Sequence, residues 1–336
     1  MTPWSELHKE ASLAKSIALR RPFNVLAQVT NRCNLTCSFC DFWPHGAPKD
    51  ELTLDEYAGL SEQLAGIGSF VVSIEGGEPM VRADLVPIVQ TFARWHFPVV
   101  YTNGWFIDDA SADALIAAGV SQVGVSIDYP DAVRHDAKRG RAGTWDRAWA
   151  AVERLRARAP RGSRQIHVMT VLMEDNLADL DDLLAMSAQR DVGHMVTLLS
   201  TRGYRRTATD SALKGPVSDA MLARWKRWPH LRVLRDYLAG FDAFLEGRDV
   251  PACRAGAQSF NLDHVGGVAP CIEKIDAPAG NVREKPLVEL IAALRDRPDV
   301  AACNDCWTLC RGLAQGLGNG SNARSLIDLG TRLRSR

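Results

Sequence analysis

The stretch TNRCNLTCSFCDFW (Thr30 to Trp43) contains three cysteines within eight residues, spaced Cys33-x3-Cys37-x2-Cys40. It follows a strand-like apolar run, FNVLAQVT (Phe23 to Thr30). A closed zinc site has four ligands, commonly arranged as pairs separated by two residues. No second pair completes a set of that kind here. Three thiolates therefore leave one position of a metal centre open to another molecule.

Downstream of this stretch, apolar runs alternate with helical patterns. Each run is continuously apolar, which is typical of parallel strands covered on both faces. Right-handed strand–helix–strand connections then predict an α/β fold, a parallel sheet curled into a partial (β/α)6 barrel resembling a TIM barrel. Active sites of such folds lie at the carboxyl ends of the strands. We expect the six strands at 23–30, 70–79, 98–104, 122–128, 165–172 and 194–200.

The alternation ends near residue 200, and the rest of the chain is organised differently. Helices are expected near 218–229, 234–246 and 286–296, with a β-hairpin turning at residues 264–267. We place a boundary near 245–250, in the segment EGRDVP. The predicted organisation is a leader helix at 1–22, a barrel with its following helices at 23–245, and a small hairpin-plus-helix domain at 246–336.

Composition narrows the class of protein. Of the 336 residues, 46% are hydrophobic and 24% charged, with a net charge of zero, as in ordinary soluble globular proteins. Neutrality argues against a nucleic-acid or membrane surface, which needs a basic face. The N-terminus lacks the apolar run of a signal peptide, and no segment has membrane-spanning length. We therefore expect a cytoplasmic protein whose eight cysteines are metal ligands and not disulfides.

The placement of the first cysteines in this barrel resembles the radical SAM family. They follow the first strand, Phe39 precedes the last of them, and GGEP (Gly76 to Pro79) closes the second strand. The resemblance covers about residues 23–200 and implies a [4Fe–4S] cluster on Cys33, Cys37 and Cys40. It implies that the open iron binds S-adenosylmethionine, whose reductive cleavage gives a hydrogen-abstracting 5′-deoxyadenosyl radical. It also implies an external one-electron reductant of flavodoxin or ferredoxin type. An open zinc site or a purely electron-carrying cluster is the alternative.

Ten residues match positions expected to contact S-adenosylmethionine. Glycine lets backbone approach a ligand closely, a buried carboxylate could bind an ammonium, and a guanidinium could bind a carboxylate. For the Asn, Ser and Arg of this set, strand-end capping or surface charge is an equally open alternative. The set is Phe39, Gly76, Gly77, Glu78, Pro79, Asn103, Ser126, Arg139, Val171 and Leu172.

The five remaining cysteines resemble the SPASM/twitch extension of the same family. In that extension a hairpin with a glycine at its turn, here Gly266, carries the first two ligands of an auxiliary [4Fe–4S] cluster. A full SPASM domain has more cysteines, including a Cys-x5-Cys step that is absent here. The resemblance therefore implies one auxiliary cluster, on Cys253, Cys271 and two of Cys303, Cys306 and Cys310. A structural zinc site on the same thiolates is the alternative.

The leading interpretation is a radical SAM oxidoreductase that acts on a small biosynthetic metabolite and passes an electron to the auxiliary cluster. The second is a maturase that crosslinks or oxidises a short ribosomal peptide. A non-catalytic electron carrier and an RNA-modifying enzyme are further alternatives, and net neutrality argues against the latter. The sequence does not identify a general base. Arg202, Tyr204 and Arg205 are candidates to line the substrate space, because they follow the sixth strand.

Overall fold

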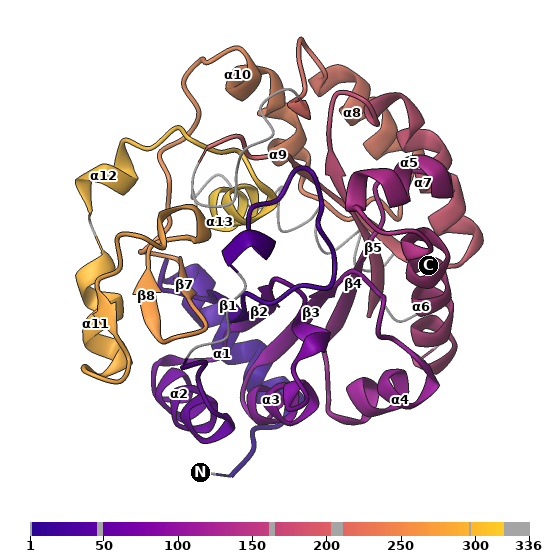
Figure 1. The fold of residues 1–336 in the computed structure, drawn as a ribbon. Coiled ribbons are helices and arrows are strands. Elements are labelled where there is room, and N and C mark those ends of the chain that lie inside the picture. Colours follow the sequence, from indigo (N-terminus) through magenta and orange to yellow (C-terminus); the bar gives the residue numbers. More distant parts are fainter. Residues whose placement is uncertain (1, 46–49, 161–164, 203–210, 296, 319–336) are drawn as a thin grey trace.

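One curved sheet organises the molecule. The structure is a computed structural model that describes residues 2–45, 50–160, 165–202, 211–295 and 297–318. The sheet has the order β6-β5-β4-β3-β2-β1-β7-β8-β9 (Figure 1), and β1 to β6 are mutually parallel, which confirms the expected alternation. The strands are β1 (Asn24–Thr30), β2 (Val71–Gly76), β3 (Phe97–Thr102), β4 (Gln122–Ser126), β5 (Ile166–Leu172), β6 (Gly193–Leu198), β7 (Ser259–Leu262), β8 (Gly267–Ala269) and β9 (Gly280–Asn281).

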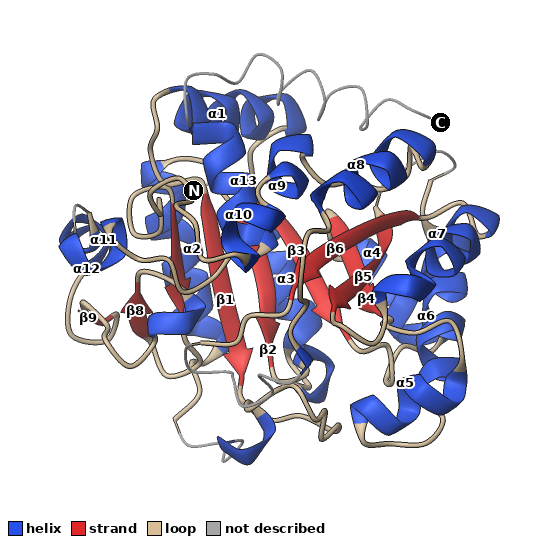
Figure 2. Ribbon diagram, turned by 90° about the horizontal axis from the view of Figure 1, so that it is seen from above, coloured by secondary structure: helices blue, strands red, loops and turns tan. Residues whose placement is uncertain are grey.

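Helices surround the curved sheet, while the last helix, α13, lies across its inner side (Figures 1 and 2). α2 begins with the expected capping box, in which Thr53 and Glu56 satisfy each other's backbone N–H groups. The helices are α1 (Glu6–Ala18), α2 (Leu54–Ile67), α3 (Leu85–Ala93), α4 (Asp109–Ala117), α5 (Ala132–Arg139), α6 (Thr144–Arg158), α7 (Leu180–Gln189), α8 (Ser218–Arg227), α9 (Arg235–Ala239), α10 (Phe241–Leu245), α11 (Leu287–Leu294), α12 (Pro298–Ala301) and α13 (Leu309–Gly318). Short 3₁₀ turns are η1 (Trp43–His45), η2 (Pro79–Val81), η3 (Leu177–Asp179) and η5 (Ile272–Lys274).

The two faces of the sheet have different roles. Successive residues of a strand point to opposite faces. On β2, Val72 and Ile74 pack into the main apolar core under the outer helices, whereas Val71, Ser73 and Glu75 line a cavity inside the barrel. The outer face therefore provides burial and stability, and the inner face is available for ligands.

Two features differ from the simplest reading of the sequence. The helix expected at 234–246 is divided into α9 and α10 at Gly240, a residue whose lack of a Cβ lets the ring of Trp307 pack against it. The expected hairpin forms as β7 and β8, and β7 also pairs with β1 in parallel, Asn24 opposite Ser259. The segment after 246 therefore continues the sheet of the barrel.

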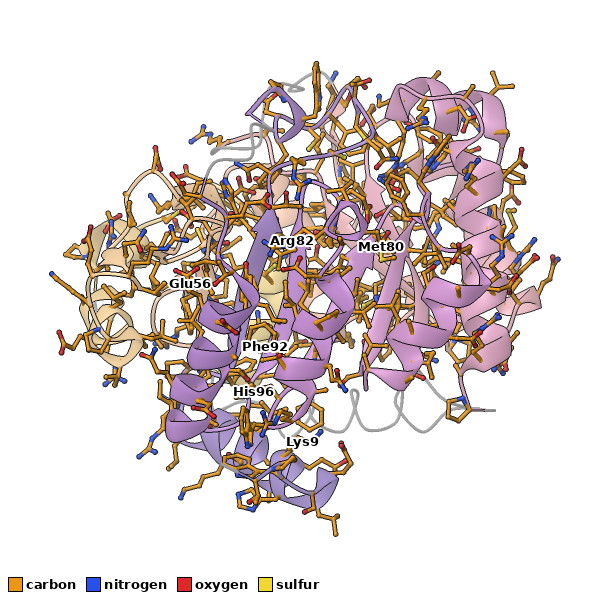
Figure 3. The ribbon with its side chains drawn as sticks, turned by 60° about the horizontal axis from the view of Figure 1, so that its bottom comes forward. Lys9, Glu56, Met80, Arg82, Phe92 and His96 are labelled. Carbon is orange, nitrogen blue, oxygen red and sulfur yellow. The ribbon has the colours of Figure 1, made fainter. Side chains whose placement is uncertain are left out.

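The end of the barrel remote from the cysteine loop is closed by α1 and the connections into the strands. Figure 3 shows Lys9, Phe92 and His96 together at this end, with Arg82 and Met80 towards the other. Lys9 donates to the carbonyl of Ala93 (3.1 Å), and the ring of His96 hydrogen-bonds the carbonyl of Ser61 (2.9 Å). Among the helices described, none combines the length and apolar character needed to cross a membrane.

Candidate functional site

The first cysteine loop leaves the carboxyl end of β1 and is fastened to the neighbouring strands. Cys37 is buried, while Cys33 and Cys40 are partly exposed. The N–H of Leu35 donates to Sγ of Cys33 (3.4 Å), and the indole N–H of Trp43 donates to the carbonyl of Cys37 (3.3 Å). The three thiols therefore lie on one compact loop, at the edge where the sequence predicts the active site.

Burial favours the protonated form of Cys33 and Cys37 in the absence of a metal. It raises the pKa of Cys33 to about 12 and that of Cys37 to about 11. Thiolates form in such surroundings when a cation binds them. In the described part of the chain, no three Cys, His, Asp or Glu side chains converge tightly enough to enclose a single metal ion. Cysteine thiolates are the ligands of iron–sulfur clusters, so the residue type of this loop fits such a cluster.

Close backbone packing explains why positions 76 and 77 are both glycine. A Cβ on Gly76 would lie 2.2 Å from the carbonyl oxygen of Thr30, and one on Gly77 would lie 2.2 Å from that of Arg32. Gly76 also has a φ of +140°, which side chains rarely permit. The N–H groups of Gly77 and Glu78 donate to those same two carbonyls, both at 2.8 Å. The glycines thus allow β2 to close against the cysteine loop.

Glu78 holds the next loop in place. It is fully buried, and burial raises its pKa. Its carboxylate accepts bonds from the hydroxyl of Thr102 (2.8 Å) and the backbone N–H groups of Asn103 (2.7 Å) and Met80 (3.0 Å). Asn103 in turn donates from Nδ2 to Oδ1 of Asn34 in the cysteine loop (2.9 Å). Glu78, Asn103 and the buried Pro79 therefore position the loop, and any contact with a cofactor stays a prediction.

Arg139 forms a buried ion pair that the sequence did not suggest. Its guanidinium donates twice to Asp128, at 2.6 and 2.9 Å, and lies 5.5 Å from the centre of the Phe39 ring. Burial alone would lower the pKa of Arg139, but Asp128 and Cys37 raise it, so the charge is retained. Oδ1 of Asp128 also accepts the N–H of Val171 (3.0 Å). Arg139 is thus engaged by Asp128, beneath the cysteine loop.

A cavity of about 700 Å³ runs through the barrel from the first cysteine loop. Phe39, Cys40, Gly76, Ser126 and Val171 line its upper end. Leu172 lies on the opposite face of β5, in a separate apolar cluster between the sheet and α7 to α9. Strand alternation explains the difference: Val171 faces the barrel cavity and Leu172 does not. A contact of Val171 with S-adenosylmethionine stays a prediction.

The second cysteine group encloses a smaller cavity. Beside β7 and β8, all five C-terminal cysteines line it, together with Glu273 and Arg311. Gly266 occupies the hairpin turn with a φ of +95°. Burial raises the pKa of Cys271, and the neighbouring Cys306 and Cys253 raise it further. Burial also raises the pKa of Cys306 to about 11, and Cys253 and Cys303 add to that effect. These four thiols therefore lie near one another.

Cys310 occupies a distinct position among the five. It lines both the small cavity and the barrel cavity, which Cys40 of the first group also lines. Cys40 and Cys310 both pack against one apolar cluster formed by Leu26, Phe42 and Ile272. The two cysteine groups therefore meet across the barrel interior.

The remaining candidates from the sequence lie elsewhere. The side chain of Arg202 is 73% exposed and pairs with Asp305 (3.3 Å), so the structure does not place it in the cavity. Tyr204 and Arg205 lie outside the described residues. The sequence reading missed Glu75 and Tyr101, which line the cavity on adjacent strands. Strand alternation places Glu75 on the same face of β2 as Val71 and Ser73, and its carboxylate is the signal that the sequence offered.

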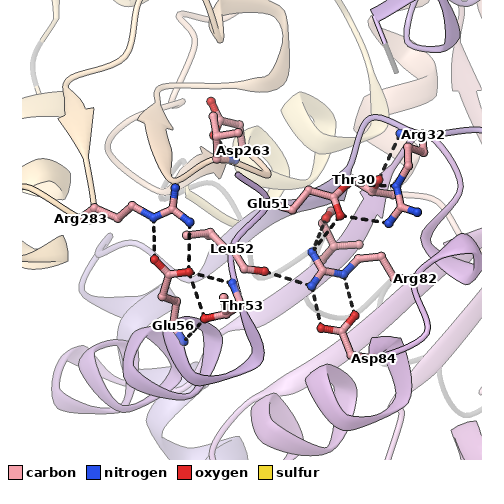
Figure 4. A network of polar contacts seen from close by, with 12 residues as sticks. Thr30, Arg32, Glu51, Leu52, Thr53, Glu56, Arg82, Asp84, Asp263 and Arg283 are labelled. Carbon is pink, nitrogen blue, oxygen red and sulfur yellow. Dashed lines mark hydrogen bonds and ion pairs between the residues drawn. The ribbon is translucent and has the colours of Figure 1, made fainter. Parts of the chain in front are cut away.

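Below the cysteine loop, a polar network ties the barrel to the C-terminal segment (Figure 4). Arg82 donates to Asp84 (2.7 Å) and to the carbonyl of Leu52 (3.0 Å). Farther along, Arg283 pairs with Glu56 (2.6 Å), and this pair holds the pKa of Glu56 at about 2. The loop entering α2 is therefore fixed from both sides.

Comparison with known proteins decides the family. Residues 27–186 match the sequence model of the Radical SAM superfamily. This part of the chain is a radical SAM domain. The cysteine loop and GGEP fall inside the matched range, and so do all ten residues expected to contact S-adenosylmethionine. The family implies a [4Fe–4S] cluster with S-adenosylmethionine, and the three thiols of the loop fit it, because full ligation would need a fourth.

Relatives of this radical SAM protein are biosynthetic enzymes. It is 25% identical to the AdoMet-dependent heme synthase of Nitratidesulfovibrio vulgaris, over 78% of this chain and 77% of the relative. It is 28% identical to the mycofactocin maturase MftC of Mycolicibacterium smegmatis, over 88% and 78%. SuiB of Streptococcus suis, solved bound to its precursor peptide SuiA, shares the fold with a TM-score of 0.65 at 15% identity, covering 87% of this chain and 70% of SuiB. The chain is therefore a radical SAM enzyme.

Proposed function

We propose that this enzyme is an oxidoreductase that removes a hydrogen atom from a substrate in the barrel cavity and delivers the remaining electron to an auxiliary [4Fe–4S] cluster. One observation carries the proposal: a single cavity is bordered by Cys40 of the first cysteine group and Cys310 of the second. A substrate in this cavity would lie between the site where hydrogen is removed and the site that takes up the electron.

The first site is assigned to residues of the loop and the strand ends. Cys33, Cys37 and Cys40 would hold the cluster that, with S-adenosylmethionine, supplies a 5′-deoxyadenosyl radical when bound. Phe39, Gly76, Ser126 and Val171 line the adjoining cavity and would contact the cofactor. Gly77, Glu78, Pro79, Asn103 and Arg139 would position these groups from behind.

The auxiliary cluster is assigned to Cys253, Cys271, Cys303 and Cys306. All four line the small cavity. Cys306 and Cys253 add to the burial that raises the pKa of Cys271, and Cys253 and Cys303 add to the burial that raises the pKa of Cys306. Cys310 acts electrostatically on Tyr101 and, together with Cys306, on Tyr237, and of the five C-terminal cysteines it is the one that lines the barrel cavity. We therefore assign Cys310 as the fifth thiol, on the substrate side of the cluster.

Glu75 is the group best placed to accept a proton. Its carboxylate lines the cavity one residue before Gly76, next to Tyr101 on β3. Oxidation of an alcohol or amine carbon breaks a C–H bond homolytically and then an O–H or N–H bond heterolytically. The hydrogen atom would pass to the 5′-deoxyadenosyl radical, the proton to Glu75 and the electron to the auxiliary cluster, which leaves a C=O or C=N product.

The substrate is a small metabolite or one residue of a short peptide. A cavity of about 700 Å³ is within the range of small-molecule sites, and α13 lies across it, which favours a compact substrate. The peptide alternative is favoured by the relatives, which include a maturase and a protein solved with a precursor peptide. Incubation with a perdeuterated candidate distinguishes them, because the true substrate transfers deuterium into 5′-deoxyadenosine.

The radical chemistry is tested by anaerobic reconstitution followed by dithionite. The unaltered protein should bind about eight irons and release 5′-deoxyadenosine from S-adenosylmethionine. Cys33→Ala/Cys37→Ala/Cys40→Ala should keep about four irons and release none. If the unaltered, reconstituted protein releases no 5′-deoxyadenosine, the proposal fails. A count of about four irons with stoichiometric zinc would indicate that the C-terminal cysteines bind a structural zinc ion and not an auxiliary cluster.

A further inference from the structure

Two arginines enclose a tryptophan beside the outer edge of the first cysteine loop. The guanidinium carbon of Arg141 lies 3.6 Å from the centre of the Trp105 ring, and that of Arg147 lies 4.2 Å from it. Arg141 also donates to the carbonyl of Asn34, the residue after Cys33 (3.2 Å). Arg147 donates to the carbonyl of Trp105 (3.3 Å). Both cations are therefore held in place next to the loop.

These two charges face solvent. Arg141 and Arg147 are exposed, and neither forms an ion pair among the described residues. Neighbouring carboxylates are mostly engaged: Asp136 accepts the backbone N–H groups of Gly143 and Trp145, and Asp175 pairs with Lys138. Asp146, which precedes Arg147, is also exposed and lowers the net positive charge of this surface by one. The arginines differ in this respect from most on this surface, such as Arg134, which binds two aspartates.

Exposed aromatic side chains accompany the arginines around the loop. Phe106 follows Trp105 and is 40% exposed, and Trp43, whose indole is bonded to Cys37, is 43% exposed. Thr36 and Ser38, between the cysteines, are exposed as well. Arginine and aromatic side chains are enriched at protein interfaces, and they supply most of the binding energy there.

The proposed function requires electrons from outside the chain, and an electron carrier must dock near the first cysteine loop to deliver them. We propose that Arg141, Arg147, Trp105, Phe106 and Trp43 form the docking surface for an acidic one-electron carrier protein. The fixed guanidinium pair would attract acidic side chains around the redox group of the carrier, and the exposed rings would pack against its apolar rim. The inference rests on the proposed function, since it names the partner that would supply electrons to the cluster of the first cysteine group.

The test compares reductants of different size, using the full-length, reconstituted enzyme and uncoupled release of 5′-deoxyadenosine as the readout. Bacterial flavodoxin, kept reduced by NADPH and its reductase, serves as the acidic protein donor. Dithionite, an anion, and reduced methyl viologen, a cation, serve as small donors that need no docking. In Arg141→Glu/Arg147→Glu, the flavodoxin-driven rate should fall about tenfold or more at low salt and approach the unaltered rate at high salt. The rates with both small donors should stay within twofold.

A matched control is Arg227→Glu. Arg227 is also exposed and also lies over a tryptophan, Trp228 at 5.0 Å, but it pairs with Asp181 (3.7 Å) and is on α8, away from the cysteine loop. This variant should keep the unaltered rate with every donor. An unchanged flavodoxin-driven rate in the double variant would overturn the proposal. Equal losses of rate with all three donors would also overturn it, because they would mean that the arginines hold the cysteine loop in place. Failure of the unaltered enzyme with both small donors would instead refute the proposed function.

Discussion

The two cysteine groups are held in place by different means. The first is carried on a loop that direct hydrogen bonds tie to its neighbours: Asn103 donates from its backbone N–H to Glu78 and from its side chain to Asn34. The second lies among short strands and irregular segments beside β8, where the thiols themselves form much of the cavity wall. The protein alone thus shapes the first site, whereas the second depends more on what its thiols bind.

Removal of iron from the reconstituted protein should affect the two cysteine groups most differently. We expect the loop at 31–42 to keep its backbone hydrogen bonds, and the cysteine-bearing segments at 251–258 and 271–279 to open, because metal binding and local folding are coupled where the metal replaces a core. Hydrogen exchange on the reconstituted and iron-stripped proteins measures both. Equal loss of protection in the two regions would remove the distinction.

Gly77 tests whether close backbone packing holds the first site. Gly77→Ala places a Cβ 2.2 Å from the carbonyl of Arg32, so the cysteine loop must shift. A displacement of about 1 Å costs roughly 10²-fold in rate where reacting groups are positioned, and we expect dithionite-driven release of 5′-deoxyadenosine to fall by that order. Gly59→Ala is the control: it meets no atom within 4 Å in α2 and should stabilise the protein slightly. Retained activity in Gly77→Ala would mean that the loop adapts.

Local features of the fold could be predicted from the sequence, and long-range contacts could not. The strands, the capping box and the cysteine loop were predictable, because local patterns determine them. The buried partners were not: Asp128 reads as an ordinary strand-end aspartate, and only the fold brings Arg139 to it. The pairing of β7 with β1 was equally hidden, since more than 200 residues separate Asn24 from Ser259. Long-range contacts of this kind leave no periodic signal in a single sequence.

Asp128 tests the burial of charge beneath the first loop. Asp128→Asn leaves Arg139 buried without its anion, and breaking such a pair costs about 3–5 kcal/mol. Urea unfolding of the variant should show a loss of that size. The control is Asp109→Asn, whose partner Arg158 lies in a surface pair with Asp109 72% exposed, where the loss should be below about 1 kcal/mol. Similar losses in the two variants would indicate that Arg139 reaches water when its partner is removed.

Acid should act first on the barrel, which contains the fully buried histidines. Burial lowers the pKa of His96 to about 4, so the folded state holds it neutral while the unfolded chain protonates it near its ordinary value. Stability from this group is therefore complete above about pH 6.5 and is lost as the pH falls towards 4. Between pH 6.5 and 5 the loss is about 1.5 kcal/mol for this one residue. His96→Gln should flatten the pH dependence of unfolding, and His8→Gln, an exposed site, should not; equal slopes would refute the assignment.

The smallest effect is expected where the two regions meet through charge. Arg283, after β9, pairs with Glu56 of α2 at 2.6 Å, but both side chains are about one-third exposed. Arg283→Gln should therefore cost less than about 1 kcal/mol. Leu290 of α11 is buried in the same apolar core as Leu60 and Leu64 of α2, and Leu290→Ala should cost about 2–5 kcal/mol. If the charge variant proved as costly as the core variant, the hairpin and α11 would be attached by the surface pair. The expected order makes them part of the barrel core, which leaves only the cysteine-bearing segments dependent on metal.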